Sequence, residues 1–313
     1  MTQSRYTEWG QPAYTGTDQR GDAMKRWGIL LIVCVAVVSA SVLGAWLDPL
    51  GAFHPRTARV PVLTYHHLAD QSDGSVTVSA DLFDEQMRAL YEAGCTPVLP
   101  RDLYEYVYKG KKLPRNPVMI TFDDGYLSNF DIAFLLLKKY DFRATIFVIG
   151  VTFGKDTYKD GRTPITPHFG EEPAREMLAS GLVSIQSHSF DMHQFAPYDE
   201  NPRSGILRRD GEGEQDYIHA LRDDCEKEAD LIRCVTGLDV LAFAYPFGYH
   251  DASSAELLRE MGIKMTFTTE PGQNTLIQGE PSSLMDMRRY TIDGSVSPEA
   301  LLRIVEGALE KGA

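Results

Sequence analysis

The chain has 313 residues, of which 43% are hydrophobic, and a formal net charge of −13 at pH 7. A chain of this length and composition buries a core large enough for one barrel-sized domain or two small ones. The negative charge argues against functions that need a basic surface, namely binding to nucleic acid or to another polyanion, and it is compatible with a neutral or cationic polymer as partner.

The first element is an uncharged apolar stretch, 27–47, of about the length of a membrane span. Lys25 and Arg26 precede it, which favours a helix with its amino end in the cytoplasm. A cleaved signal peptide is the alternative, since small residues near the end of the stretch can host a cleavage site. We expect an uncleaved, single-pass anchor in the cell membrane. The expected segments are a cytoplasmic tail 1–26, the membrane helix 27–47, a linker 48–59 and an extracytoplasmic domain 60–313.

From residue 60 onward, strand patterns alternate with helix patterns. The expected strands are 60–66, 96–99, 118–122, 144–150, 182–188, 238–245, 263–269 and 287–292, and the expected helices are 80–93, 102–108, 128–140, 172–180, 216–235, 254–261 and 298–309. We expect 151–170 to be a functional surface loop and the charged helix 216–235 to be a solvated outer face. The alternation predicts a parallel barrel or a doubly wound sheet in one α/β domain.

The strand 118–122 ends in two adjacent carboxylates, Asp123 and Asp124, followed by Gly125. The carboxyl ends of strands carry the chemistry in α/β folds, and neighbouring strand residues point to opposite faces. Two carboxylates in a row can therefore do two jobs, one holding a metal and one handling a proton. A plain Asp-Asp-Gly turn is the alternative interpretation.

Two histidines, His188 and His193, follow the strand 182–188. A spacing of five separates two rings around a helix, so these rings can converge only from a loop. Together with Asp124 they form a two-histidine, one-carboxylate set that suits Zn²⁺, or another divalent transition metal such as Co²⁺ or Ni²⁺, with positions left open for water and substrate. The alternative is that the two histidines are unrelated.

Three motifs resemble those of a known family: 121–125 (TFDDG), 187–193 (SHSFDMH) and 244–248 (AYPFG). They are similar to the first three motifs of the polysaccharide deacetylases, also called carbohydrate esterase family 4 or the NodB-homology domain. The likeness is greatest to deacetylases of biofilm poly-N-acetylglucosamine, and it extends from about residue 60 to the C-terminus. It implies an irregular (β/α)7-type barrel of about seven strands and a metal-dependent hydrolase that removes N-acetyl groups from an N-acetylglucosamine polysaccharide.

The resemblance also implies roles for single residues. Asp123 would be the base that takes a proton from the attacking water, and the backbone N–H of Phe247 would stabilise the oxyanion together with the metal. The implied metal ligands are Asp124, His188 and His193. Apart from the resemblance, the aromatic residues Tyr245, Phe247 and Tyr249 can supply stacking walls for a sugar, although aromatic residues beside a strand more often belong to the core.

Two family features are missing from this chain. The third motif usually has an arginine two residues before its proline, where this chain has Ala244; Arg288 or Arg289 is a possible replacement. The histidine of the fifth motif, which supplies the catalytic acid, is absent because no histidine follows His250.

The biofilm-type members resemble a circularly permuted arrangement in which an N-terminal Tyr-His supplies this acid. His66, which follows Tyr65, matches that position, and His67 is the second choice. Two other functions remain open: a catalytically silent carbohydrate-binding protein on the same fold, and another metal hydrolase such as a phosphatase, which would need a basic phosphate clamp.

Overall fold

The computed structural model describes residues 56–73, 76–194 and 198–310. They belong to one compact unit that begins at Arg56. The expected tail 1–26, the expected membrane helix 27–47 and most of the linker 48–59 lie outside the described residues. Within the described ranges, no helix is long and apolar enough to cross a membrane.

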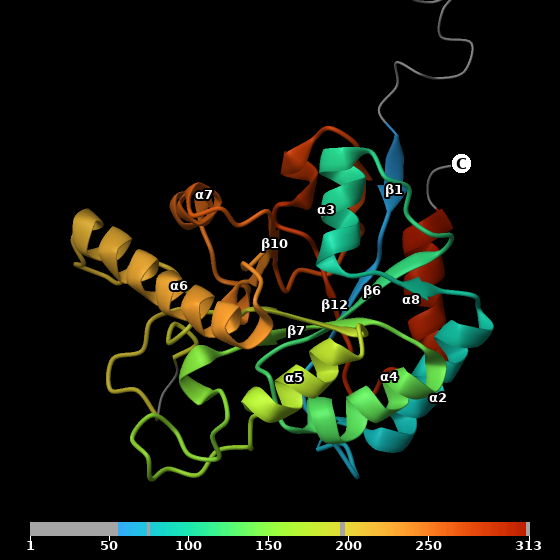
Figure 1. Cartoon of the computed structure of the whole chain (residues 1–313), viewed down its shortest axis with the longest axis horizontal. Coiled ribbons are helices and arrows are strands. Elements are labelled where there is room, and N and C mark those ends of the chain that lie inside the picture. Colours follow the sequence, from blue (N-terminus) through green and yellow to red (C-terminus); the bar gives the residue numbers. More distant parts are fainter. Residues whose placement is uncertain (1–55, 74–75, 195–197, 311–313) are drawn as a thin grey trace, which may run out of the picture. The chain divides into compact units, whose positions relative to one another are not determined.

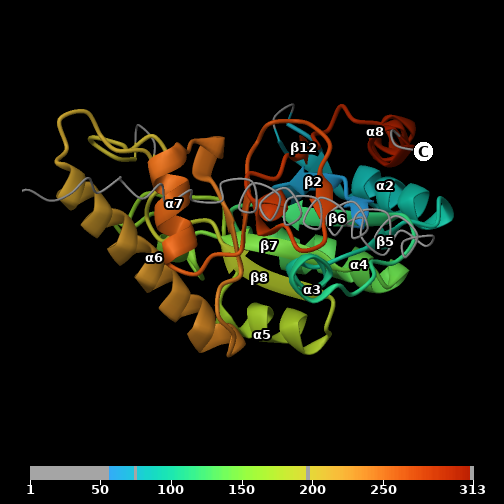
Figure 2. The same cartoon turned by 90° about the horizontal axis from the view of Figure 1, so that it is seen from above.

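A curled parallel sheet forms the core of this unit (Figures 1 and 2). Its strands follow the order β10–β9–β8–β7–β6–β2–β12, and β5 pairs with the start of β6. The strands are β2 (Val62–Tyr65), β5 (Thr96–Pro97), β6 (Pro117–Phe122), β7 (Ala144–Val148), β8 (Val183–Ser187), β9 (Ala242–Ala244), β10 (Met265–Phe267) and β12 (Tyr290–Thr291). The predicted α/β class with a parallel sheet is confirmed.

The two ends of the sheet approach each other through the segment that leads into β12. The N–H of Met287 donates to the carbonyl of Thr266 (2.8 Å), and the N–H of Thr268 donates to the carbonyl of Met287 (2.9 Å). Three residues further on, Tyr290 pairs with Leu63 of β2. The polypeptide around residues 287–291 therefore links β10 to β2 and brings both sheet ends to one place.

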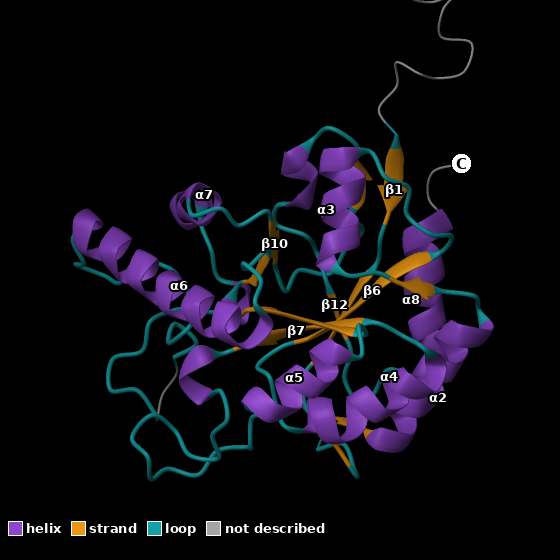
Figure 3. Cartoon of the chain, in the orientation of Figure 1, coloured by secondary structure: helices purple, strands orange, loops and turns teal. Residues whose placement is uncertain are grey.

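Helices cover the outside of the sheet (Figure 3). They are α2 (Ala80–Glu92), α3 (Pro100–Lys109), α4 (Leu135–Tyr140), α5 (Glu171–Ala179), α6 (Glu214–Thr236), α7 (Ala252–Glu260) and α8 (Pro298–Glu310). A π-helical turn, Asn129–Phe134, precedes α4. Helices α2, α4 and α8 pack near β2 and β6, whereas α5 and α6 pack against β8 (Figure 2).

Small elements complete the unit. Strand β1 (Thr57–Arg59) pairs antiparallel with β11 (Thr275–Ile277), so the end of the expected linker belongs to the folded domain. Strands β3 (Leu68–Ala69) and β4 (Val78–Ser79) form a short parallel pair. Single turns of 3₁₀ helix are Gly150–Thr152, Pro246–Gly248 and Pro281–Leu284.

Helix α6 differs from the expected solvated outer face. Asp223 and Lys227 are exposed and form an ion pair, as expected for such a face. Asp224 and Glu228, however, are buried on the side that packs against the sheet. Their spacing from the apolar positions is helical, which places them in the same stripe as Leu221. The expectation of a helix with only solvated charges is therefore wrong.

Candidate metal centre and catalytic site

Asp123 and Asp124 follow β6, and the backbone turns their carboxylates apart. The N–H of Asp123 still donates to the carbonyl of Tyr65 (2.9 Å), so Asp123 continues the ladder between β6 and β2. Asp124 adopts a left-handed φ of 72°, which few non-glycine residues do. At Gly125, φ is 79° and an added Cβ would lie 3.0 Å from Cγ1 of Val148, so this position requires glycine.

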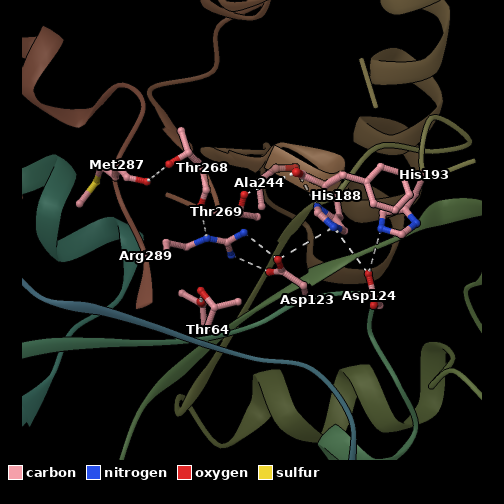
Figure 4. A network of polar contacts seen from close by, with 12 residues as sticks. Thr64, Asp123, Asp124, His188, His193, Ala244, Thr268, Thr269, Met287 and Arg289 are labelled. Carbon is pink, nitrogen blue, oxygen red and sulfur yellow. Dashed lines mark hydrogen bonds and ion pairs between the residues drawn. The ribbon is translucent and has the colours of Figure 1, made fainter. Parts of the chain in front are cut away.

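The carboxylate of Asp124 lies beside both predicted histidine ligands (Figure 4). Its Oδ1 atom is 3.5 Å from Nε2 of His188 and 3.6 Å from Nε2 of His193. One ligand atom from each of the three residues lies within 4.8 Å of the others. Oδ1 of Asp124 is also buried without a hydrogen-bond partner among the described residues. The three residues therefore fit a divalent cation with two nitrogen ligands and one oxygen ligand.

The protonation states also suit a metal. Nδ1 of His188 is 2.8 Å from the carbonyl oxygen of Ala244. A carbonyl only accepts, so Nδ1 carries the proton and the lone pair of Nε2 faces Asp124, the tautomer that a metal ligand needs. Burial lowers the pKa of His188 to about 4, which keeps the ring neutral at pH 7. Burial raises the pKa of Asp124, but His193 and its neighbours outweigh burial, so the pKa falls and the carboxylate is charged.

Asp123 is bound on one side by Arg289 and lies beside His188 on the other, with 4.0 Å between its Oδ2 atom and Nε2 of His188 (Figure 4). Nη1 of Arg289 donates to Oδ1 of Asp123 and Nη2 donates to Oδ2, both at 2.7 Å, and Nε donates to the carbonyl of Thr268 (2.8 Å). The guanidinium is fully buried. Burial raises the pKa of Asp123, but Arg289 and His188 outweigh it, so the pKa lies far below its ordinary range. The carboxylate is therefore ionised and held in a fixed orientation.

The sequence left two arginines open as replacements for the missing motif-three arginine, and the structure distinguishes them. Arg289 makes the bidentate pair with Asp123, whereas Nη2 of Arg288 lies 3.4 Å from Glu270 on the exposed surface. In the sequence, Arg289 could have been recognised by its position directly before the short strand β12, which begins at Tyr290. A strand in the sheet holds every second side chain inside, but the phase of so short a strand is not readable from sequence.

His66 and His67 follow β2 and have different surroundings. The ring of His66 is close enough to Asp123 and Asp124 to lower the pKa of both carboxylates. Its Nδ1 atom is buried and has no hydrogen-bond partner among the described residues. Nδ1 of His67, in contrast, lies 2.9 Å from Oγ of Ser128. Of the two histidines, His66 is thus the one whose ring nitrogen is not already bonded.

A sequence model of the family described as polysaccharide deacetylase matches residues 110–266. The chain belongs to the polysaccharide deacetylase family. YxkH of Bacillus subtilis (strain 168), a polysaccharide deacetylase by assignment only, is 29% identical over 224 residues, which cover 72% of this chain and 69% of the relative. The poly-β-1,6-N-acetyl-D-glucosamine N-deacetylase of Escherichia coli (strain K12) is 26% identical over 232 residues. This alignment covers 67% of this chain and 34% of the relative, so the chain spans about a third of that protein.

A solved structure gives the same result for the fold. IcaB from Ammonifex degensii matches with a TM-score of 0.65 and 25% identity, over 80% of this chain and 97% of that one. Family and enzyme class, both expected from the three motifs, are confirmed. The roles of the single residues remain predictions. The geometry of the deacetylase site shows which atoms would carry each role.

The aromatic residues after β9 of the deacetylase separate into two groups. Phe247 is 37% exposed and Tyr249 is 52% exposed, and the ring of Phe247 lies against His193 with centroids 4.2 Å apart. Tyr245 is 0% exposed, its hydroxyl donates to Asp286 (2.9 Å), and its ring stacks on His250. Because no face of Tyr245 is accessible, the expectation that it stacks on a sugar is wrong; its ring is part of the core.

A cavity of about 150 Å³ opens beside Asp124 and His193. Tyr126 and His168 line it near the carboxylate, and Tyr158 lines it from the loop 151–170. The ring centroids of Tyr126 and His168 are 4.9 Å apart. The expected surface loop 151–170 therefore contributes to the walls of the site.

Asp224 of α6 also contacts the loop that carries the histidines, and none of the three sequence motifs contains it. Its carboxylate accepts hydrogen bonds from the main chain between His188 and His193. The available signal was an acidic residue within the apolar stripe of an otherwise charged helix. A buried carboxylate in such a position needs partners, which a solvated face does not.

Proposed function

We propose that the chain is a metal-dependent deacetylase that removes N-acetyl groups from N-acetylglucosamine residues of an extracellular polysaccharide, and that its sheet is the seven-stranded (β/α) barrel of the family. The products are acetate and a free amine on the sugar. The observation that carries the proposal is the set formed by Asp124, His188 and His193 beside an ionised Asp123. The polymer named for the E. coli relative, poly-β-1,6-N-acetylglucosamine, is the substrate we propose.

Asp124, His188 and His193 would hold the ion, for which Zn²⁺ is our first choice and Co²⁺ or Ni²⁺ the alternatives. When bound, such an ion polarises the acetamide carbonyl and acidifies water. The histidines supply two neutral ligands and Asp124 supplies a negative charge. His188 is kept in the binding tautomer by the Ala244 carbonyl.

Asp123 acts as the general base. Its two oxygens are fixed by Arg289, and its lowered pKa keeps it ionised, the state in which a carboxylate can act as a base. The N–H of Phe247 donates to the oxyanion that develops on the acetamide. His66, with its unbonded Nδ1, gives a proton to the departing amine. The faces of Phe247 and Tyr249 bind the sugar next to the site.

We further propose that the stretch 27–47 anchors the enzyme in the cell membrane, with the catalytic unit outside. The charge before the stretch and its length support an anchor rather than a cleaved signal peptide. A membrane-bound deacetylase would meet the polymer at the cell surface.

Acetate release tests the proposal. Purified protein is incubated with poly-β-1,6-N-acetylglucosamine, peptidoglycan and chitin oligomers, with and without a chelator, and acetate is measured. We expect release from the first polymer, loss of release with the chelator and recovery with Zn²⁺ or Co²⁺. The same assay on cell fractions should place the activity in the membrane pellet; activity in the soluble fraction would contradict the anchor. Binding of a polymer without acetate release would favour the silent carbohydrate-binding protein.

A further inference from the structure

The polypeptide between the two histidine ligands is held from outside by one carboxylate. Oδ2 of Asp224 accepts the N–H of Phe190 (2.8 Å), and Oδ1 accepts the N–H of Asp191 (2.7 Å). Both oxygens of this buried side chain are thus committed to two consecutive amides. These amides lie in the middle of the loop that starts at His188 and ends at His193, which we call the histidine loop.

The two ligands depend on this loop to different degrees. His188 directly follows β8, its N–H donates to the carbonyl of Val148 (2.8 Å), and its ring is oriented by the Ala244 carbonyl. His193 comes five residues later and is positioned through the loop. Ser189, just after His188, has a left-handed φ of 73°, a conformation that non-glycine residues hold only when the surroundings impose it. The position of His193 therefore depends on contacts made by residues 189–192.

A second acidic residue of α6 supports the same region one helical turn away. Glu228 is fully buried, and neither of its carboxyl oxygens has a hydrogen-bond partner from a side chain in the described structure. Gly150, at the start of the 3₁₀ turn after β7, leaves room for it, because an added Cβ would lie 2.2 Å from Oε2 of Glu228. The N–H of Gly150 donates to the carbonyl of Ser189 (3.2 Å). The segment after β7 and the histidine loop are therefore in contact with each other, and Asp224 and Glu228 lie beside this contact.

Burying acids inside a helix–sheet interface is unfavourable compared with apolar residues of similar size. Burial raises the pKa of Asp224 to about 6, and burial also raises the pKa of Glu228 well above its ordinary value. A helix that only covered the sheet would gain stability from apolar side chains at both places. An apolar side chain could not accept the two hydrogen bonds that Asp224 accepts from the histidine loop.

We propose that Asp224 is a positioning residue of the metal site: by holding the amides of Phe190 and Asp191, it sets the place of His193 relative to His188 and Asp124. The inference rests on the proposed function, in which these three residues bind the metal. The hydrogen bonds of Asp224 go to the main chain of the loop and not to a ligand side chain, so it acts through the loop. It is comparable in effect to residues that orient metal ligands by hydrogen bonds, whose loss weakens metal binding about 10- to 100-fold.

The test is Asp224→Asn, with Asp223→Asn as its matched control. Asn keeps the size of the side chain but replaces one acceptor oxygen by an NH₂ group that cannot accept from an amide. Asp223 is the neighbouring residue on the same helix, 67% exposed and paired with Lys227. Co²⁺ binding to the full-length protein is measured by titration calorimetry and by the visible absorption spectrum, and folding of the metal-free protein is measured by circular dichroism and urea unfolding.

We expect Asp224→Asn to remain folded without metal, to bind Co²⁺ about 10- to 100-fold more weakly, and to show an altered Co²⁺ spectrum. Asp223→Asn should match the wild type in affinity and spectrum. A folded Asp224→Asn protein with wild-type affinity and spectrum overturns the inference, because a residue needed only for packing would not alter the coordination spectrum.

Asp224→Glu covers the case in which the amide variant does not fold. It retains the charge and both acceptors but displaces them by one methylene, so a smaller loss of Co²⁺ affinity is expected; wild-type affinity would overturn the inference here too. If the wild-type protein itself binds no Co²⁺, the proposed function fails and this inference fails with it. If the wild type binds and the Asp224 variants bind equally well, only this inference fails.

Discussion

Two pairs of buried acids lie close to the histidine loop, and their pKa values are shifted in opposite directions. In the pair Asp123–Asp124, burial alone would raise the pKa values, but Arg289 and the histidines outweigh it and both carboxylates are charged. In the pair Asp224–Glu228, burial dominates and both pKa values are raised. The two pairs have the same chemistry and similar burial. The groups facing them decide the direction in which the pKa values are shifted.

This difference matches two different roles: the first pair is suited to catalysis and metal binding, and the second pair to holding the polypeptide in place. The general base that we propose, Asp123, must be charged at the working pH, and the bidentate bond from Arg289 favours the charged form. The α6 pair faces backbone amides and the turn at Gly150 instead of a guanidinium. It is suited to holding polypeptide in place. Substitutions in each pair should therefore have different consequences.

The largest expected effects concern the first pair. Asp123→Asn should keep the metal and lose about 10²–10⁴-fold in kcat, since the base acts on water without holding the ion. Asp124→Ala should lose both metal and turnover, since it removes a ligand. Metal content measured by atomic emission and acetate release from the polymer distinguish the two outcomes.

Loss of metal from Asp123→Asn would show that the two neighbouring carboxylates do not have separate jobs. Normal turnover by this variant would remove Asp123 from the role of base. Asp160→Asn is a suitable control, because Asp160 is an exposed aspartate of the loop 151–170 that caps its own turn. It should leave metal content and kcat unchanged.

The next largest effect concerns the group that protonates the departing amine. Asp123 is ionised and is proposed to take the proton of the attacking water, so we assign protonation of the departing amine to a separate group, His66. His66→Ala should keep fold and metal but lose on the order of 10²-fold in kcat, with a change in the limb of the pH profile that reports the acid. His67→Ala is the matched control, since the Nδ1 atom of His67 is already bonded to Ser128. If His66→Ala turns over at the wild-type rate while His67→Ala or His250→Ala does not, the assignment is wrong.

The sequence predicted the first pair well because its signals are local. The β-branched and aromatic run of β6 predicted a buried strand, and the position of Asp123 and Asp124 at its carboxyl end predicted their place at the site. The five-residue spacing of His188 and His193 predicted a loop, and the structure brings both rings to Asp124. Alternation of apolar segments predicted the helices and strands around them to within a few residues.

The partners that decide ionisation were harder to predict because they come from distant parts of the chain. Arg289 and Asp123 are separated by 166 residues, and a two-residue strand gives no reliable phase for its side chains. Asp224 was assigned to a solvated face because charges dominate α6 on average. For Tyr245 the sequence allowed either a sugar-stacking or a core position, and the bond of its hydroxyl to Asp286 belongs to the core position. The partners of Arg289, Asp224 and Tyr245 all depend on contacts between segments that are far apart in the sequence.

The smallest expected effect concerns the second pair and is one of stability. The pKa of Glu228 is raised above its ordinary value of 4.5, so the folded protein holds a proton that the unfolded chain has released above that pH. The stability that this proton contributes is present in full below about pH 4.5 and is lost as the pH rises towards the folded pKa. Each unit of separation between the two pKa values corresponds to about 1.4 kcal/mol.

Glu228→Gln removes this titration and keeps the shape of the side chain. The variant should therefore lose less stability than the wild type between pH 5 and pH 8, with a difference on the order of 1 kcal/mol or more. Urea unfolding of the metal-free protein at both pH values measures it. Glu226→Gln, an exposed glutamate on the same helix, should follow the wild-type curve. If Glu228→Gln follows that curve as well, Glu228 is ionised in the folded protein, and the contrast between the two acid pairs no longer holds.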